Sequence, residues 1–300
     1  MTEPVIRTRD LTKWYGRNRG IEGLDLEVGP GEIVGYLGPN GAGKTTTIRL
    51  LLDLIRPSRG SAELFGLDVR RHGADLRRRV GYLPGGLRLY ESLSGRELLD
   101  YFGGLRGRRD RLLEARLAER LDLDLTREIR SLSHGTKQKV GLVAALAAAP
   151  DLLILDEPTT GLDPLVQIEL FELLTEVRGE GRTVFLSSHI LPEVERACDR
   201  VAFIREGRLV AMEAITAFKA RAVRRVELQF AEPVPAGAFA GLPGVRDVAQ
   251  DGTTLTCSVM GPVDAVVKEA ARHTVVAVTS AEPSLEDLFL AQYRETADAA

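Results

Sequence analysis

A glycine-rich stretch carries the clearest chemical signal in the sequence: Gly38-Pro39-Asn40-Gly41-Ala42-Gly43-Lys44-Thr45. Its spacing matches the pattern GxxxxGK[ST], which indicates a phosphate-binding loop when it lies between a strand and a helix. The flanking residues supply that context, because 32–37 is expected to form a buried strand and the segment from Thr46 a helix that ends before Pro57. A glycine-rich turn with a chance lysine is the alternative, and the flanking elements disfavour it.

Each residue type in this loop has a physical reason. Glycines allow consecutive backbone N–H groups to turn inward around phosphate oxygens, and the positive end of the following helix strengthens the attraction. Lys44 would add a cation at the β- and γ-phosphates, and the Thr45 hydroxyl could ligate Mg²⁺. The loop therefore predicts binding of a nucleoside triphosphate together with Mg²⁺.

Two adjacent carboxylates follow a second buried run, Leu152–Leu155. Asp156, at the end of this expected strand, would hold Mg²⁺ through water. Glu157 beside it could polarise the attacking water as a general base. A strand that ends in two solvated carboxylates is the alternative, and the upstream phosphate-binding loop disfavours it.

Composition excludes several classes of protein. The 300 residues are 44% hydrophobic and 28% charged, as in ordinary globular proteins, and the net charge of −3 gives no field that would attract nucleic acid. Arginine clusters at 77–79 and 106–111 are expected to be solvated helix faces rather than binding patches. Cys198 and Cys257 stand alone, which fits a reducing compartment and indicates neither a disulfide framework nor a zinc site.

No segment has the character of a signal peptide or a membrane span. The first ten residues are polar, and the most apolar window, Val140–Ala149, is shorter than the roughly 20 residues that a spanning helix needs. We therefore expect the chain itself not to cross a membrane.

Hydrophobic patterning predicts an α/β domain over 1–220. Antiparallel strands are expected before residue 34, a mostly helical region over 86–149, and central parallel strands at 152–155 and 184–186. A strand–turn–strand over 200–211 completes this domain. The 3.6-residue period of the helical region is carried by Leu98, Leu99, Phe102, Leu105, Leu112, Leu113, Leu117 and Leu121.

The sequence changes character at about residue 221, which predicts a small α+β domain over 221–300. A basic joint at 221–225 precedes expected strands at 226–230, 254–259 and 275–278. An amphipathic helix is expected around Val263, Val266, Val267 and Ala270, and a final helix is expected from a Ser284 cap through Leu290. No cluster of metal-ligating side chains occurs there, so a structural or dimerising role is the default.

Four further motifs resemble those of the ABC ATPases. The segment Ser133–Gln138 begins 23 positions before Asp156, and together with Leu132 it resembles the LSGGQ signature. Gly161-Leu162-Asp163 looks like the D-loop, and His189 ends a strand where that family has its switch histidine. Tyr15 matches the aromatic residue that stacks on adenine. The resemblance covers about residues 5–215.

The resemblance implies a P-loop NTPase core with a mixed sheet, an antiparallel β subdomain and a helical subdomain. It also implies an ATPase in which two such subunits meet head to tail around ATP and Mg²⁺. Ser133 and the Gly135 N–H would bind the γ-phosphate held by the opposite subunit, and Asp163 would couple the two sites. The implied catalytic residues are Lys44, Glu157 and His189; the implied metal ligands are Thr45 and Asp156; the implied ATP-binding residues are Tyr15, Gly38, Pro39, Asn40, Gly41, Ala42, Gly43, Lys44, Thr45 and Thr46.

The sequence departs from the family pattern at two motifs. Gly85 follows Tyr82-Leu83-Pro84 where the family usually has a glutamine that offers an oxygen to Mg²⁺, and water could take that position. The signature has His134 for glycine and Thr136 for glutamine, although its serine and second glycine remain. We expect hydrolysis to be retained, and these changes are compatible with a slow rate.

Transport is the favoured biological role. Only 89 positions separate Lys44 from Ser133, without sustained heptads, which disfavours chromosome-associated ABC proteins. Ribosome-acting members usually have two such domains in one chain. The 82–98 region and the 283–289 motif are similar to ATPase subunits of bacterial drug and antibiotic exporters. We therefore expect a separate transmembrane permease, a second nucleotide-binding subunit (identical or related), no nucleic acid, and a place at the cytoplasmic face of the membrane; the cargo is not encoded here.

Overall fold

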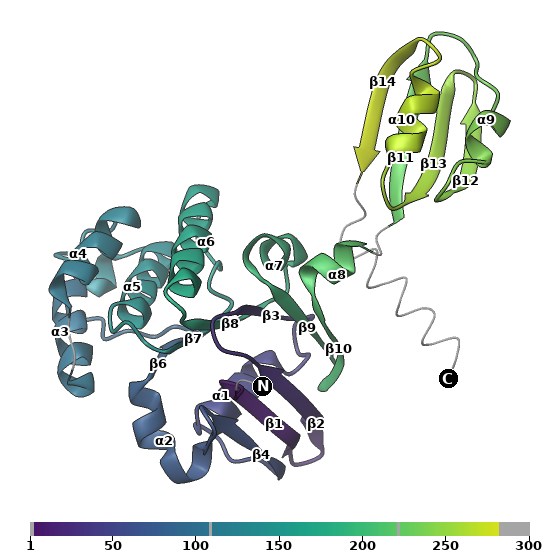
Figure 1. The fold of residues 1–300 in the computed structure, drawn as a ribbon. Coiled ribbons are helices and arrows are strands. Elements are labelled where there is room, and N and C mark those ends of the chain that lie inside the picture. Colours follow the sequence, from purple (N-terminus) through teal and green to yellow (C-terminus); the bar gives the residue numbers. More distant parts are fainter. Residues whose placement is uncertain (1–2, 108–109, 221–222, 282–300) are drawn as a thin grey trace. The chain divides into compact units, whose positions relative to one another are not determined.

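The computed structural model describes residues 3–107, 110–220 and 223–281. The chain divides into two compact units, Met1–Glu213 and Ala214–Ala300, and each is described by itself (Figure 1). The division lies close to the boundary expected at residue 220. Assignment of the two units as separate domains over 1–220 and 221–300 stays a prediction.

A six-stranded sheet forms the centre of the larger unit. Its order is β10-β9-β3-β8-β7-β6, and the pairs from β9 to β6 are parallel. Every residue of β3, β7 and β8 is buried, as expected for strands that are covered on both faces. The bounds are β3 Ile33–Leu37, β6 Val80–Leu83, β7 Leu152–Asp156, β8 Thr183–Ser188, β9 Arg200–Arg205 and β10 Arg208–Ala214.

The strands of a separate antiparallel sheet lie on both sides of the phosphate-binding loop in the sequence. Its order is β2-β1-β4-β5, and its apolar residues share one hydrophobic core with β3 and the helix after it. Alternating burial along β2 shows one face packed and the other in solvent. The bounds are β1 Ile6–Tyr15, β2 Asn18–Val28, β4 Arg59–Leu64, β5 Leu67–Asp68, α1 Lys44–Leu51 and α2 Val69–Arg78.

The helical region is shorter than expected from its sequence. Helices α3, α4 and α5 form a group beside the β6 and β7 end of the central sheet (Figure 1). Residues 86–94 form no helix, because the segment begins in the Gly85-Gly86 turn and helix α3 starts only at its Ser94–Glu97 capping box. The bounds are α3 Gly95–Arg106, α4 Arg111–Arg120, a 3₁₀ turn Ile129–Ser131, α5 His134–Leu146, α6 Pro164–Gly179 and α7 Leu191–Ala197.

Two of the leucines assigned to the buried face of this region are in solvent. Leu98 and Leu121 are fully buried, whereas Leu105 is 65% and Leu112 80% exposed. The 3.6-residue period expected over this region does not run unbroken, because α3 ends at Gly107, which adopts a left-handed φ of 67°, and Leu112 belongs to the separate helix α4.

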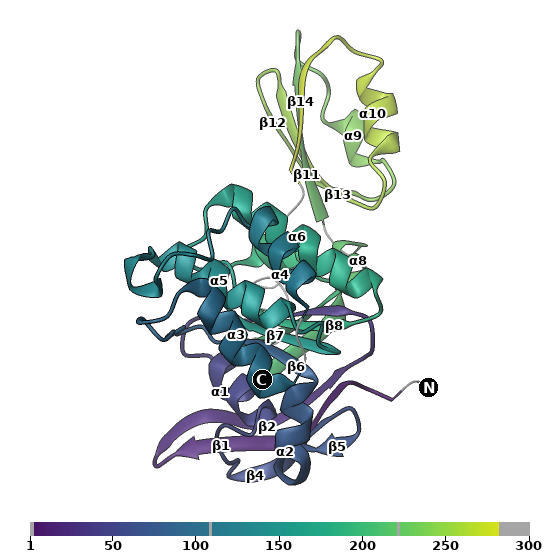
Figure 2. The same ribbon diagram turned by 90° about the vertical axis from the view of Figure 1, so that its left-hand side faces the viewer.

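The smaller unit is a four-stranded antiparallel sheet of order β12-β13-β11-β14 with α9 and α10 on one face (Figure 2). Alternate residues of β11 and β13, including Val226, Leu228 and Cys257, pack against these helices. The sequence did not predict β12 or α9, and the expected helix from Ser284 through Leu290 lies outside the described residues, as does the 283–289 motif. The bounds are α8 Ile215–Ala220, β11 Val223–Phe230, α9 Gly237–Ala240, β12 Val245–Asp251, β13 Thr254–Met260, α10 Asp264–Ala270 and β14 Val275–Ala281.

The two kinds of leucine on α3 should respond differently to truncation. We expect Leu98→Ala to lower the free energy of unfolding by about 2–5 kcal/mol, because it leaves a cavity in the core. Leu105→Ala should change it by less than about 0.5 kcal/mol, because the side chain is mostly in solvent. Urea unfolding followed by circular dichroism measures both, and equal losses would contradict the assigned packing of α3.

Candidate active site

The phosphate-binding loop joins the end of β3 to the start of α1. Gly41 and Gly43 have φ values of 82° and 107°, a backbone region that L residues rarely adopt. A Cβ on Gly43 would lie 2.7 Å from the Gly20 carbonyl oxygen, and one on Gly38 would lie 2.2 Å from that of Ile204. The glycines are therefore required both by conformation and by the close approach of neighbouring backbone.

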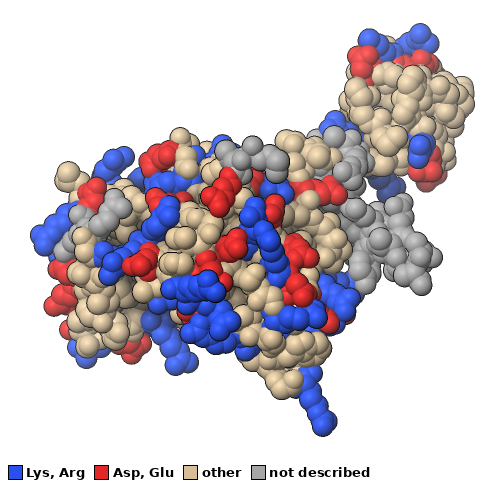
Figure 3. All heavy atoms as spheres, turned by 60° about the horizontal axis from the view of Figure 1, so that its bottom comes forward, with Lys and Arg blue, Asp and Glu red and all other residues tan. Residues whose placement is uncertain are grey.

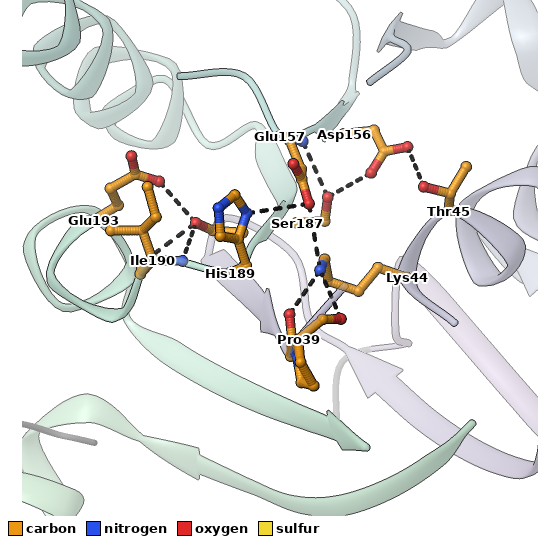
Figure 4. A network of polar contacts seen from close by, with 11 residues as sticks. Pro39, Lys44, Thr45, Asp156, Glu157, Ser187, His189, Ile190 and Glu193 are labelled. Atoms are coloured by element: carbon orange, nitrogen blue, oxygen red, sulfur yellow. Dashed lines mark hydrogen bonds and ion pairs between the residues drawn. The ribbon is translucent and has the colours of Figure 1, made fainter. Parts of the chain in front are cut away.

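Lys44 turns back over this loop. Its ammonium group donates to the carbonyl oxygens of Gly38 at 2.6 Å and Pro39 at 3.2 Å, and it lies 3.3 Å from Oε1 of Glu157 (Figure 4). The side chain is only 5% exposed. A buried cation needs such compensating oxygens, and the same position lets it reach an anion bound in the loop.

Two oxygen-bearing side chains meet beside the loop. Oγ1 of Thr45 donates to Oδ2 of Asp156 at 2.8 Å, across the gap between α1 and β7. Mg²⁺ takes oxygen ligands and usually keeps waters and substrate phosphates as its other ligands, so a pair of protein oxygens fits this ion. The part of the chain that is described holds no group of three His, Cys, Asp or Glu side chains that would suit another metal.

Glu157 lies between the lysine and the predicted switch histidine. Oε1 is 3.3 Å from Nδ1 of His189 and 3.3 Å from Nζ of Lys44 (Figure 4). The glutamate adopts a left-handed φ of 51°, which is uncommon outside glycine and turns its side chain away from the strand direction. The structure thus brings together Lys44, Thr45, Asp156, Glu157 and His189, as the sequence predicted.

Tyr15 lies beside the start of α1 at the edge of this site. A Cβ on Gly20 would be 2.9 Å from the Tyr15 ring and 3.1 Å from the methyl group of Thr46, so these two side chains are neighbours. The ring is half exposed, with Nζ of Lys13 5.2 Å from its centroid. An exposed aromatic face here is suited to stacking on a base.

The signature residues are placed elsewhere in the chain. Oγ of Ser133 caps α5 by accepting from the Thr136 N–H at 3.2 Å, and its side chain is exposed. Among the described residues, no hydrogen bond or ion pair joins Ser133 or Gly135 to residues 38–46. The close neighbour of Gly135 is Gly161, whose carbonyl oxygen would be 2.3 Å from a Cβ on Gly135.

Two structural roles were not predicted from the sequence. Asp163 caps α6, because its Oδ1 accepts from the N–H groups of Leu165 and Val166, both at 3.1 Å. Its Asp-Pro sequence at a helix start was the available signal. Gly85 lies beside Asp156, because a Cβ on Gly85 would be 3.2 Å from the Asp156 carboxylate. The backbone of Gly85 therefore occupies space next to the predicted metal ligand.

Comparison with known proteins decides the family. Residues 21–160 match the family described as ABC transporter. A bacitracin transport ATP-binding protein of Bacillus licheniformis is 35% identical over 294 residues, which cover 95% of this chain and 96% of that protein. A daunorubicin resistance ATP-binding protein of Streptomyces coeruleorubidus is 35% identical over 303 residues, covering 97% and 96%. The chain belongs to the ABC transporter ATP-binding family.

Solved structures agree with this assignment. The structure of an ATP-binding subunit of an ABC transporter is 32% identical with a TM-score of 0.67, and the match covers 72% of this chain and 92% of that one. A dimeric bacterial ABC transporter cassette, 23% identical with a TM-score of 0.66, has the same fold. The predicted ABC-type P-loop fold is confirmed, and the chain is an ATP-binding and ATP-hydrolysing subunit of an ABC transporter.

The assigned general base has a sharp test. We expect Glu157→Gln to lower the rate of ATP hydrolysis by about 10²–10⁴-fold, because the amide has the size of the carboxylate but does not accept a proton. ATP affinity should stay within a few-fold of the native value. Phosphate release and nucleotide binding measure the two effects.

Glu172→Gln supplies the matched control, because Glu172 is exposed on α6 and takes no part in the site. Native-like hydrolysis by Glu157→Gln, or an equal loss in the control, would contradict the assignment.

Proposed function

We propose that this ABC subunit hydrolyses ATP with Mg²⁺ in a dimer and thereby energises a separate export permease at the cytoplasmic face of the membrane. The observation that carries the proposal is the convergence of Lys44, Asp156 and Glu157 at the ends of adjacent elements, within hydrogen-bonding or ion-pair distance of Thr45 and His189. Charge of both signs is concentrated there, as phosphoryl transfer requires.

Each side chain has a role that follows from its position. The backbone N–H groups of residues 38–45 and the ammonium of Lys44 bind phosphate oxygens, and Tyr15 stacks on the base. Thr45 and Asp156 hold Mg²⁺, which supplies positive charge near the phosphates when it is bound. Glu157 accepts the proton of the attacking water, and His189 contacts the γ-phosphate.

The second half of the nucleotide site comes from another subunit. Ser133 is exposed at the N-terminus of α5, where N–H groups and the helix dipole favour an anion. Because neither Ser133 nor Gly135 bonds to the described phosphate-binding loop of its own chain, a partner's nucleotide is the fitting ligand. The partner subunit is either a second copy or a related chain.

A groove beside β6 is the proposed permease contact. It has a volume of 540 Å³ and is bounded by α2, β6, α3 and α5 of the larger unit. Its lining contains apolar side chains, of which Leu54 and Leu105 are exposed, and no acidic residue. The basic residues of the lining are Arg77, Arg78, Arg88 and Arg106. This chemistry fits an amphipathic helix that inserts apolar side chains and places carboxylates at the rim.

Tyr82 connects this groove with the metal-binding side chain. It lines the groove, while burial and then the nearby Asp156 carboxylate raise its pKa to about 12. The phenol is therefore neutral at physiological pH and packs between the two regions. A helix bound in the groove would contact β6, the strand that carries Tyr82. Strand β6 pairs directly with β7, which carries Asp156.

Export is favoured by the relatives. They include a bacitracin transport protein, a daunorubicin resistance protein and a Nod factor export ATP-binding protein of Paraburkholderia xenovorans, the last 36% identical over 298 residues, covering 97% of both chains. Within the described residues, no helix has both the length and the apolar character needed to span a bilayer. In the proposed complex, the permease brings the chain to the membrane.

A soluble ABC ATPase acting on DNA or ribosomes is the alternative. Basic and acidic side chains are intermixed on the face of the larger unit seen in Figure 3, which offers no single-sign field for nucleic acid. The arginines of the groove are interleaved with apolar side chains rather than arranged along an open surface. These features favour a protein partner.

Co-expression with an export permease from the same genome tests the role. We expect the two to co-purify from detergent, with Mg²⁺-dependent phosphate release that is lost in EDTA. Binding to ribosomes or DNA in place of a membrane protein, or absence of Mg²⁺-dependent hydrolysis in the assembled complex, would overturn the proposal.

Charge reversal in the groove tests the permease contact. We expect Arg88→Glu to reduce co-purification of the permease about tenfold or more, because it opposes the carboxylates of the docking helix. Hydrolysis by the isolated chain should be unchanged.

Arg70→Glu is the matched control, because Arg70 is exposed on α2 and does not line the groove. Equal co-purification of both variants with the permease would place the contact elsewhere.

A further inference from the structure

A single buried hydroxyl connects the two acidic residues of the site. Oγ of Ser187, on β8, lies 2.6 Å from Oδ1 of Asp156 and 3.0 Å from the backbone N of Glu157 (Figure 4). Ser187 is fully buried and Asp156 is 1% exposed, so water does not replace these bonds. The two strands also pair at this point, with Asp156 opposite Ser187.

The direction of the two hydrogen bonds follows from their chemistry. A backbone N–H can only donate, so Oγ accepts from Glu157 and directs its own proton to Oδ1 of Asp156. This fixes the carboxylate with Oδ1 turned to the sheet and Oδ2 turned to Thr45. Oδ2 is thereby the oxygen that faces the proposed Mg²⁺ position.

The same hydroxyl holds a strained piece of backbone. The left-handed conformation of Glu157, with a φ of 51°, is unfavourable for a residue with a Cβ. Its N–H is held by Oγ of Ser187 and by the Ser187 carbonyl oxygen at 3.2 Å. Without these bonds the backbone could relax, and the carboxylate would leave its place beside Lys44 and His189.

We propose that Ser187 is a positioning residue for ATP hydrolysis, which sets the orientation of both the metal-binding carboxylate and the general base. The inference rests on the proposed roles of Asp156 and Glu157. Ser187 touches neither the nucleotide nor the metal, and it acts through the two residues that do. Polar groups behind metal ligands commonly change metal affinity or activity by about 10–100-fold when they are removed.

A hydroxyl that merely stabilises the β7–β8 pair would behave differently from a positioning residue. Thr183 provides the comparison, because it lies on the same strand, is 1% exposed and also bonds backbone. Its Oγ1 accepts from the Gly31 N–H at 3.0 Å and lies 3.4 Å from the Gly29 carbonyl oxygen, at the opposite end of β8. Thr183→Val removes these bonds and keeps the shape of the side chain.

The experiment compares Ser187→Ala with Thr183→Val in the full chain. Binding of a fluorescent ATP analogue is measured at increasing Mg²⁺ concentrations and, separately, in EDTA. Phosphate release at saturating Mg-ATP gives the turnover rate, and thermal unfolding gives the stability. For Ser187→Ala we expect Mg²⁺ half-saturation to rise and the turnover rate to fall, each by about 10–100-fold, with binding in EDTA within about twofold of native. Thr183→Val should lose stability and keep native Mg²⁺ dependence and turnover.

Two conservative variants keep the test decisive. Ser187→Thr retains the hydroxyl and should recover most of the turnover. Ser187→Cys places a weak hydrogen-bond donor of similar size at this position. It should show the loss of turnover expected for Ser187→Ala, and it can be measured even if the alanine variant folds poorly. The proposal is overturned if Ser187→Ala or Ser187→Cys keeps native Mg²⁺ dependence and turnover, or if Thr183→Val loses both equally. Absence of Mg-ATP hydrolysis in the native protein would instead overturn the proposed function itself.

Discussion

The parallel alignment of β3, β7 and β8 positions the side chains that are proposed to be catalytic. Leu37 is opposite Ser188, and Asp156 is opposite Ser187, so the three strands end at nearly the same level. The Gly38 N–H then donates to the Ser188 carbonyl oxygen at 3.3 Å, which continues the sheet into the phosphate-binding loop. A shift of one residue between β7 and β8 would turn the Asp156 side chain to the other face of the sheet.

Electrostatic compensation explains why this edge can hold so many polar groups. The ammonium of Lys44 is nearly excluded from solvent, and Glu157 together with two backbone carbonyl oxygens compensates its charge. Asp156 is more deeply buried still and is held by the hydroxyls of Thr45 and Ser187. Removing one member leaves another polar group buried without its partner, which is costlier than the bond itself is worth. Each buried charge of the site is therefore stabilised by the polar groups around it.

The sequence predicted this site better than it predicted the surrounding helices. Loop spacing and buried apolar runs located Lys44, Asp156 and Glu157, because each motif depends on local order along the chain. Leu112 was misplaced because periodicity does not show where a helix ends, and the break between α3 and α4 depends on the left-handed Gly107. The role of Ser187 was missed for another reason: it arises from strand pairing between residues 31 positions apart. Long-range register was not contained in any single motif.

The contact between the signature and the loop after Glu157 has a mechanical consequence for a paired ATPase. Gly135 approaches Gly161 so closely that no side chain fits between them, and the His134 ring lies against the same glycine. Gln138 also donates to the Pro158 carbonyl oxygen at 3.3 Å from within the core. These contacts join the N-terminal turn of α5 to the 158–161 backbone. Because Ser133 caps that turn and Glu157 immediately precedes that loop, we expect a ligand that displaces one of them to alter the surroundings of the other.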